Sequence, residues 1–291
     1  MSLRLEMLQV ARLAPSILGD ACELVEKFVL SQQHETGGFH DRDGVADLYY
    51  TCFAIDTLTA LQSELPTKNL RRFFSAKAEN LAELDFVHLC CLARGMSAIS
   101  MSDGLEAIFS GIESYRTADG GYNQDDDSQT GSAYACFLAY GAYSDHNRQM
   151  PNTDGVRQCI QSLAVPGGAW ANDVELPIPN IPATAAAVTL CRNLRLPIPA
   201  ETGPWILNCM HESGGFQPFP MAPMPDLLTT AVALHALDGL QLEFSAQKEH
   251  VLDFVDTLWT AEGGFHGTWD DDDLDLEYTY YGLLALGHLA L

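Results

Sequence analysis

Two kinds of apolar pattern alternate along the chain, and both have a helical period. In the first kind, apolar residues recur every three or four positions and charged residues fill the opposite face, which predicts amphipathic helices with one solvent-exposed side. These segments are residues 19–32, 67–78, 103–116, 153–163, 200–211 and 245–259. The second kind is apolar nearly all round and rich in Ala, Leu, Cys and aromatic residues, which predicts helices that are covered on every side. These segments are residues 47–61, 85–96, 131–143, 183–194, 226–237 and 275–286.

A glycine pair followed by Phe, Tyr or Ala recurs between these predicted helices. The pairs are Gly37-Gly38, Gly120-Gly121, Gly167-Gly168, Gly214-Gly215 and Gly263-Gly264. The last four pairs lie 47 to 49 residues apart and the first gap is close to two such intervals, so six helix-pair units fit the chain. A repeat unit buries its apolar face only against its neighbours. We therefore expect an all-α fold, an α6/α6 toroid in which six outer helices surround six inner ones, as a single domain over residues 1–291.

The chain has an excess of acidic residues, which limits the kinds of molecule that it is expected to bind. The chain has 39 Asp and Glu against 15 Lys and Arg, a formal charge of -24, which argues against nucleic acid and against an anionic membrane surface. A protein partner bound through the acidic face, a cationic ligand or a metal would suit this charge, and a solvated acidic surface would explain it equally well. The sequence predicts neither a membrane span nor a secretory signal, and its cysteines lack metal or disulfide spacing. We therefore expect a cytoplasmic protein with buried thiols.

Aspartates recur at or just before the starts of the predicted inner helices. They are Asp47, Asp85, Asp127, Asp226 and Asp275. Part of this placement is N-capping, because a carboxylate satisfies free backbone N–H groups at a helix start. In a toroid all inner helices begin at the same mouth, so these residues are also predicted to line that mouth with carboxylates. Two acidic runs add to the effect, at residues 125–127 and 270–273.

The repeats resemble those of protein prenyltransferase β subunits and of the squalene and terpene cyclases, over essentially the whole chain. The resemblance is carried by the Gly-Gly-Phe phrases together with Asp47-Leu48-Tyr49-Tyr50-Thr51 and Asp275-Leu276-Glu277-Tyr278-Thr279. It implies a toroid whose central apolar cavity takes an isoprenoid chain. A small isoprenoid substrate or another lipid is therefore the expected ligand.

The chain departs from this family at the residues that carry its chemistry. The resemblance places zinc ligands at Asp-x-Cys and at a His, but this chain has Asp226-Leu227-Leu228 and Tyr278 there, so zinc is not expected. The cyclase acid motif is replaced by residues 180–185, Asn-Ile-Pro-Ala-Thr-Ala, which hold no acid. A second set, Asp85 and His88 with Asp47, resembles a family Asp-Phe-Tyr-His phrase, and it is interpreted either as a shifted metal site or as a hydrogen-bonded structural group.

The acidic runs and the aromatic residues near them are the remaining candidates for chemistry. Adjacent carboxylates raise one another's pKa, so one of them can keep a proton or bind a divalent cation such as Mg²⁺. The predicted acids are Asp270, Asp272, Asp273, Asp275 and Asp127. The candidate metal ligands are Asp125, Asp126, Asp271 and Glu277. The predicted substrate-binding aromatic residues are Tyr49, Tyr50, Tyr122, Trp170, Trp269, Tyr278 and Tyr281.

Three functions are compatible with these features. The first is an isoprenoid-handling enzyme of the terpene-cyclase or prenyltransferase kind, in which the Asp-rich rim acts as an acid or binds Mg²⁺. The second is a zinc-less prenyltransferase β-like subunit that pairs with another chain. The third is a non-catalytic toroid that binds a lipid, a peptide or a basic partner at its acidic mouth.

Overall fold

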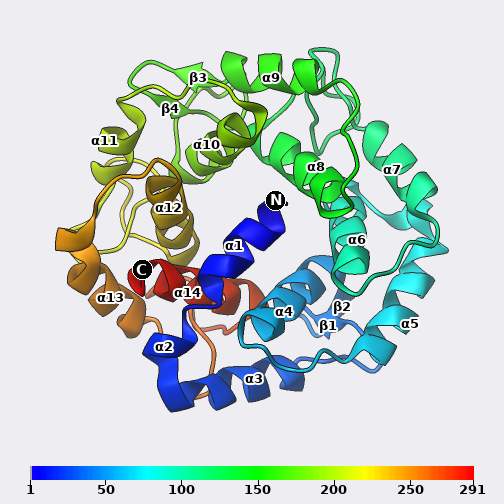
Figure 1. Cartoon of the computed structure of the whole chain (residues 1–291), viewed down its shortest axis with the longest axis horizontal. Helices are drawn as coiled ribbons and strands as arrows, with labels where there is room; N and C mark the ends of the chain where they lie inside the picture. The colour runs from blue at the N-terminus through cyan, green and yellow to red at the C-terminus, as the bar shows by residue number, and fades with distance from the viewer. Residues whose placement is uncertain (1) are drawn as a thin grey trace.

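The computed structural model describes residues 2–291 and forms an all-α toroid, as the repeat pattern predicts (Figure 1). Its inner helices pack against one another in cyclic order, and the last of them packs on the first. They are α4 (Leu48–Ala60), α6 (Phe86–Ala98), α8 (Ala133–Asp145), α10 (Ile181–Leu194), α12 (Leu227–Gly239) and α14 (Leu276–Leu289). The buried apolar side chains form one continuous core between and within the helix layers.

Amphipathic helices surround this ring. They are α3 (Cys22–Ser31), α5 (Thr67–Ala78), α7 (Leu105–Glu113), α9 (Thr153–Ser162), α11 (Thr202–Leu207) and α13 (Lys248–Thr257). The helix predicted over residues 200–211 is shorter than expected, because α11 ends at Leu207. A short helix, α2 (Pro15–Leu18), and 3₁₀ turns at Gly19–Ala21, Leu81–Glu83 and Ser245–Gln247 complete the helical part. Two antiparallel pairs of very short strands, β1 (Phe39–His40) with β2 (Ala46–Asp47) and β3 (Ala164–Val165) with β4 (Ala169–Trp170), lie in the connecting loops.

A side-chain cap fixes the start of each inner helix. Asp47, Asp85, Asp226 and Asp275 each accept a hydrogen bond from a backbone N–H of the first helical turn, as expected. Asp127 precedes an inner helix, as predicted, but does not cap it. Ser132 caps α8, and Asp127 lies in the exposed loop before it. Asn180 caps α10, where the acidic residue is also absent.

The glycine pairs allow each unit to approach the next one closely. Gly37 has a φ of +107°, and a Cβ added there would overlap the backbone of Asn69 at the start of α5. Gly263 has a φ of +96°, and its added Cβ would overlap the backbone of Leu24 in α3, near the other end of the chain. An ordinary residue would be strained at both positions and would also collide with the neighbouring outer helix. The glycine contact at Gly263 therefore belongs to the closure of the ring, because it joins the last unit to the first.

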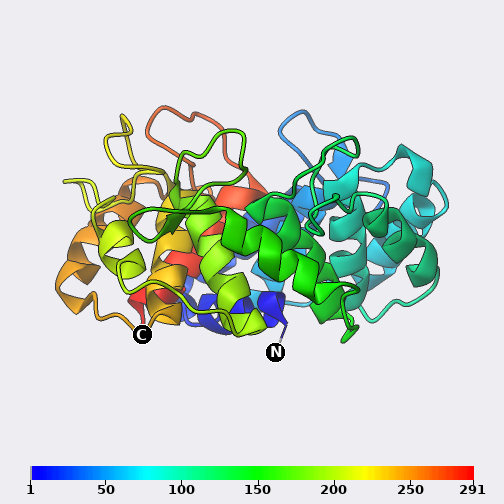
Figure 2. The same ribbon diagram turned by 90° about the horizontal axis from the view of Figure 1, so that it is seen from above.

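A helix that the hydrophobic pattern does not predict, α1 (Leu3–Ala11), lies across the ring and contacts α4, α8 and α14 (Figure 1). Arg4 Nε lies 2.6 Å from Oδ1 of the buried Asp56 on α4, and Glu6 pairs with Arg192 on α10. In the side view, α1 lies at the face that also carries both chain ends, whereas the long loops that precede the inner helices project from the opposite face (Figure 2). One mouth of the toroid is therefore covered by α1.

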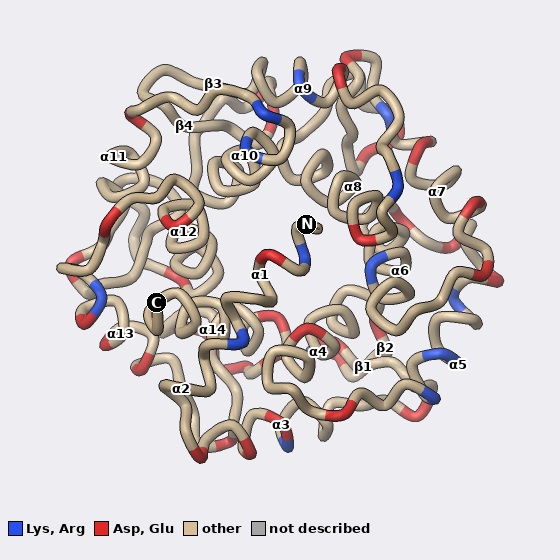
Figure 3. The backbone as a smooth tube through the Cα atoms, in the orientation of Figure 1, with Lys and Arg blue, Asp and Glu red and all other residues tan. Residues whose placement is uncertain are grey.

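None of the helices within residues 2–291 is long and apolar enough to cross a lipid bilayer. Acidic residues are spread around the whole circumference of the toroid, and the few basic residues lie between them (Figure 3).

Candidate active site

A cavity of about 230 Å³ lies inside the inner ring. Its walls come from α1 and from the inner helices α4, α8, α10, α12 and α14. Aromatic side chains line one part of it, aliphatic side chains line most of the remainder, and two polar residues complete it. The lining residues are Tyr49, Tyr134, Phe137 and Tyr281; Met7, Pro182, Ala185, Ala186, Leu228 and Val232; and Thr189 and His235. The cavity is thus apolar, with few polar groups, as is usual for a small-molecule site.

An aromatic cluster forms the wall between α4 and α14. The Tyr49 and Phe53 rings meet edge to face with centroids 4.8 Å apart, and Phe53 lies 5.6 Å from the ring of Tyr281. Tyr281 in turn lies 5.9 Å from Tyr280. The faces of such rings carry partial negative charge and attract cations. This wall can therefore stabilise positive charge that develops inside the cavity.

A carboxyl group adjoins this wall. The hydroxyl of Tyr49 donates a hydrogen bond of 2.6 Å to Oε1 of Glu277, the second residue of α14. Burial raises the pKa of Glu277 to about 7; the Tyr49 hydrogen bond acts against this rise and the negative charge of Asp275 adds to it. Burial also raises the pKa of Tyr49 well above its ordinary value, so its hydroxyl stays protonated. Glu277 can therefore hold a proton near neutral pH, which is what a general acid requires.

The Asp-rich segment before α14 is held by an arginine from the opposite end of the chain. Arg42, in the loop between β1 and β2, places Nη2 2.7 Å from Oδ2 of Asp271 and Nε 2.7 Å from Oδ2 of Asp275. Arg42 also lies 3.8 Å from Asp273, whereas Asp270 and Asp272 are exposed and no ion pair within residues 2–291 includes them. The arginine lowers the pKa of Asp271, and burial raises the pKa of Asp275. Two of the candidate acids or ligands are thus already neutralised by a resident cation.

The second acidic run forms a separate cluster. Asp125, Asp126 and Asp127 are exposed, and they are the one group in residues 2–291 whose carboxylates, imidazoles or thiols bring three ligand atoms within 4.8 Å of one another. Asp127 is held locally, because its N–H donates to Oδ1 of Asp125. No hydrogen bond or ion pair in the described part of the chain joins this run to residues 270–275. The two acidic runs therefore lie in different loops and do not form one continuous site.

The predicted aromatic residues fall into three environments. Tyr49 and Tyr281 line the cavity. Tyr50 packs against Tyr49, and the ring of Tyr278 lies 5.7 Å below the guanidinium of Arg42. The other three lie away from the cavity: Tyr122 is buried and hydrogen-bonds Glu113, Trp170 donates to the carbonyl of Ile160, and Trp269 is 45% exposed and packs on Phe254.

Tyr134, Phe137 and His235 line the cavity although the sequence did not single them out. Tyr134 and Phe137 stand three residues apart in α8, a spacing that places two side chains on one helix face. That spacing was the available signal, although it does not reveal which face is turned to the centre.

His88 acts as a hydrogen-bonded bridge between two helix caps. Its Nε2 lies 2.8 Å from Oδ2 of Asp47 and its Nδ1 lies 2.8 Å from Oδ1 of Asp85. Hydrogen bonds to these two carboxylates raise the pKa of His88 to about 9, against a smaller opposing effect of burial. A protonated imidazole donates through both nitrogens, so this group holds the starts of α4 and α6 together. This geometry matches the structural interpretation of the motif.

Several known proteins resemble this chain in sequence or in fold. The model of the prenyltransferase alpha-alpha toroid domain matches residues 13–89 and 198–290. No curated protein matches the chain by sequence. Among solved structures, the Candida albicans protein geranylgeranyltransferase-I complexed with GGPP superposes with a TM-score of 0.63 at 12% identity, covering 92% of this chain and 90% of that one.

Two further structures have the same TM-score of 0.63. A variant of the type II terpene cyclase MstE from Scytonema, in complex with its product merosterolic acid A, is 10% identical and covers 95% of this chain and 97% of its own. The GH76A alpha-1,6-mannanase from Salegentibacter is 11% identical and covers 94% of this chain and 98% of its own. At these identities the likeness is one of fold.

Proposed function

The chain belongs to the prenyltransferase alpha-alpha toroid family, and on this premise we propose that it is an isoprenoid-handling enzyme that transforms a prenyl chain inside its central cavity. The observation that carries the proposal is the partly buried contact between Tyr49 and Glu277 beside an apolar, aromatic-walled cavity. This arrangement combines a group that can give a proton with rings that stabilise a cation. It suits a reaction that begins when an alkene is protonated.

Glu277 supplies the proton and Tyr49 carries it to the cavity. Tyr49 both lines the cavity and contacts Glu277, which is not itself a lining residue. In the reacting form Glu277 is protonated and its O–H donates to the Tyr49 oxygen, which leaves the Tyr49 proton free to point into the cavity. The Tyr49 hydroxyl then gives this proton to a carbon of the double bond and takes one from Glu277, so Tyr49 ends neutral and Glu277 becomes a carboxylate. The other alkene carbon becomes the cation, which the rings of Tyr281 and Tyr134 face across the cavity. Nearby Asp275 adds negative charge.

The size and charge of the site favour a short substrate that lacks a diphosphate. A volume of about 230 Å³ is below the roughly 300–1,000 Å³ of sites for drug-sized ligands, so a geranyl chain suits it better than a geranylgeranyl chain. A diphosphate would meet an acidic mouth whose Arg42 is already paired with Asp271 and Asp275. A diphosphate substrate would therefore need Mg²⁺, with Asp125–127 as its candidate ligands.

Other reactions need groups that this cavity does not present. Cleavage of a glycosidic bond uses two carboxyl groups about 5–9.5 Å apart on either side of the sugar, and none of the lining residues in the described part of the chain is a carboxylate. A prenyltransferase β-like role needs a metal-bound thiolate partner, and Asp226, the one retained candidate ligand, uses its carboxylate to cap α12 through Thr229. A non-catalytic lipid-binding toroid remains the alternative that the experiment must separate.

The test compares Glu277→Gln with Glu262→Gln, a change at an exposed glutamate outside the site. Purified proteins are incubated with geraniol, farnesol and their diphosphates, with and without Mg²⁺, and products are followed by gas chromatography and mass spectrometry. Glutamine keeps the size of the side chain and the hydrogen bond from Tyr49 but carries no transferable proton. We expect product formation to fall roughly 10²–10⁴-fold in Glu277→Gln, while thermal stabilisation by the bound alcohol is retained.

Two outcomes would contradict the proposal. Equal product formation by the two variants would remove Glu277 from the reaction. Stabilisation by an isoprenoid without any product from the wild-type protein would favour the non-catalytic toroid.

A further inference from the structure

Two buried histidines face each other between α12 and α14, away from Glu277. His235 Nδ1 lies 3.1 Å from His288 Nε2, and the two rings meet at an angle of 60°. His235 is 6% exposed and His288 is fully buried. Burial lowers the pKa of both rings, and for His288 the neighbouring His235 and Lys248 lower it further. The pair is therefore neutral at pH 7, and one ring donates to the other.

The outer nitrogens of this pair have no hydrogen-bond partner within residues 2–291. These atoms are His235 Nε2 and His288 Nδ1. The nearest carboxylates stand just beyond hydrogen-bonding distance: Glu6 Oε1 is 3.8 Å from His235 Nε2, and Asp238 Oδ2 is 3.9 Å from His288 Nδ1. A buried polar atom left unpaired destabilises a fold, because it has given up its hydrogen bonds to water without replacing them. Two such atoms at the two ends of one hydrogen-bonded pair therefore call for an explanation.

The number of protons on the two rings limits which of their nitrogens can donate and which can accept. Two neutral imidazoles carry two N–H protons on four nitrogens, and the central hydrogen bond uses one proton and one lone pair. One end of the pair is then always an acceptor and the other end always a donor. Glu6 is already paired with Arg192, whereas Asp238 has no ion-pair partner within residues 2–291 other than His288. Because the Asp238 carboxylate has no other ion-pair partner there, it can accept the proton of His288 Nδ1, and in that arrangement His235 Nε2 is the acceptor.

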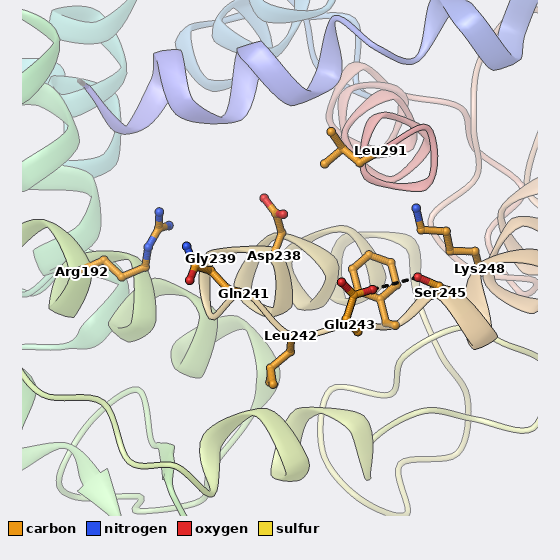
Figure 4. A pocket seen from close by; sticks show the side chains of 10 residues that line it. Arg192, Asp238, Gly239, Gln241, Leu242, Glu243, Ser245, Lys248 and Leu291 are labelled. Atoms are coloured by element: carbon orange, nitrogen blue, oxygen red, sulfur yellow. Dashed lines mark hydrogen bonds between the residues drawn. The ribbon is translucent and has the colours of Figure 1, made fainter.

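The two ends of the pair adjoin two different hollows. His235 lines the central cavity. Asp238 lines a second pocket of about 530 Å³ at the ends of α10 and α12, where it projects between Arg192 and Lys248 (Figure 4). Among the hydrogen bonds and ion pairs of the described residues, only those of His288 connect His235 to Asp238. It therefore lies between the apolar central cavity and the pocket beside Asp238.

We propose that His235 is the base that ends the reaction in the cavity, and that His288 and Asp238 pass the proton it receives to the second pocket. This inference rests on the proposed function, in which Glu277 and Tyr49 create a carbocation at the other part of the cavity. His235 Nε2 takes a proton from the carbon next to the cation, and the C–H electron pair forms the new double bond. The proton on His235 Nδ1 moves to His288 Nε2, and the proton on His288 Nδ1 leaves to Asp238 and then to water.

The result is a balanced proton cycle. One proton enters through Glu277 and one leaves through Asp238, so the hydrocarbon is rearranged without net gain or loss of protons. Each histidine ends neutral but with its proton on the other nitrogen, and the reverse shift through water resets the pair. The substrate class that follows is a short isoprenoid that is isomerised or cyclised, rather than one that is hydrolysed or transferred to a peptide.

The kinetic test uses His288→Gln, a variant whose amide can still hydrogen-bond His235 but cannot pass a proton onward. We expect kcat to fall roughly 10–100-fold while KM stays within about twofold, because the substrate does not touch His288. Asp256→Asn, at an exposed position on α13, is the matched control and retains wild-type kinetics. A merely structural histidine would be replaced by Gln without this loss. If Glu277→Gln is inactive and His288→Gln has the wild-type kcat, the relay is overturned and the proposed function stands.

A second test requires no turnover. In protein labelled with ¹⁵N in the histidine rings, the ring nitrogen shifts show which nitrogen carries each proton. We expect the wild-type protein at pH 7 to have the proton of His288 on Nδ1, and Asp238→Asn to shift it toward Nε2, whereas Asp256→Asn leaves it unchanged. Identical proton positions in the wild-type protein and Asp238→Asn, or a charged ring at pH 7, would overturn the relay. This readout judges the relay even if Glu277→Gln proves active and the proposed function fails.

Discussion

Gly263→Ala should weaken the closure of the ring, and Gly167→Ala is its matched control. Both glycines open a glycine pair and both have a φ of +96°. A Cβ added at Gly167 meets nothing within 4 Å, whereas one added at Gly263 comes within 3.0 Å of the Val25 nitrogen and closer still to the carbonyl of Leu24. The two variants therefore share the same backbone strain and differ in whether the last unit can reach the first.

The magnitude follows from these two terms. A left-handed backbone costs an alanine about 1–2 kcal/mol, and the lower entropy of the unfolded chain offsets about 0.4–1 kcal/mol of it, so Gly167→Ala should lose about 1 kcal/mol. Overlap with a backbone that cannot rotate away adds about 1–3 kcal/mol, so Gly263→Ala should lose about 2–4 kcal/mol. This is a large share of the 5–15 kcal/mol by which domains are usually stable.

Urea unfolding followed by circular dichroism measures both losses, provided that the m-value is the same in each variant. Gly214→Ala extends the comparison, because its added Cβ would overlap the backbone of His250 at an interface between consecutive units. We expect Gly214→Ala to lose about as much stability as Gly263→Ala. Equal losses in Gly263→Ala and Gly167→Ala would refute the idea that the glycine pair serves close approach between units.

Three further predictions address other contacts. The pKa of His88 is raised from 6.5 to about 9 in the folded protein, so the bridge stabilises the fold fully below pH 6.5 and progressively less as the pH rises through 9. Since His88 is about one-third exposed, we expect His88→Gln to lose about 1–2 kcal/mol of stability at pH 6 and almost nothing at pH 10. A loss that does not change with pH would contradict this. Arg4→Met should cost about 3–5 kcal/mol in urea unfolding at pH 7, because it leaves the carboxylate of Asp56 buried without its partner, and the loss should shrink at low pH, where Asp56 is protonated. Gly287→Ala would overlap the carbonyl of Val10 in α1, so limited proteolysis should cleave the α1 segment faster than in the wild-type protein, and unchanged protection would show that α1 does not depend on this close approach.

Nearby residues were enough to predict the inner helices, whereas other features of the structure depend on contacts between residues far apart in the sequence. An apolar helix such as α12 can be predicted from its own composition and from Asp226, the capping residue directly before it. The start of α8 was predicted to within two residues, whereas the outer helix predicted over residues 200–211 is shorter in the structure, where α11 covers Thr202–Leu207. Neighbouring residues therefore fix where a helix exists more firmly than where it ends.

The candidate site depends on contacts that no local pattern reveals. The helix that contains Arg4 and Glu6 was not predicted, and its two charged residues pair with Asp56 and Arg192, which lie far along the chain. Glu277 was predicted as a metal ligand because it stands beside a row of aspartates, yet its environment is set by Tyr49, 228 residues away. Arg42 likewise meets the acidic run only once the ring has closed.

The pairing of the first inner helix with the last also sets the order of events during synthesis. Tyr49 leaves the ribosome 228 residues before Glu277, an interval of about 10–50 s at about 5–20 residues per second. Throughout that time the nascent chain exposes the apolar flank of α4 that α14 will later cover. A contact between residues this far apart in sequence forms late, so the growing chain is most open to aggregation or chaperone capture just before its last helix emerges.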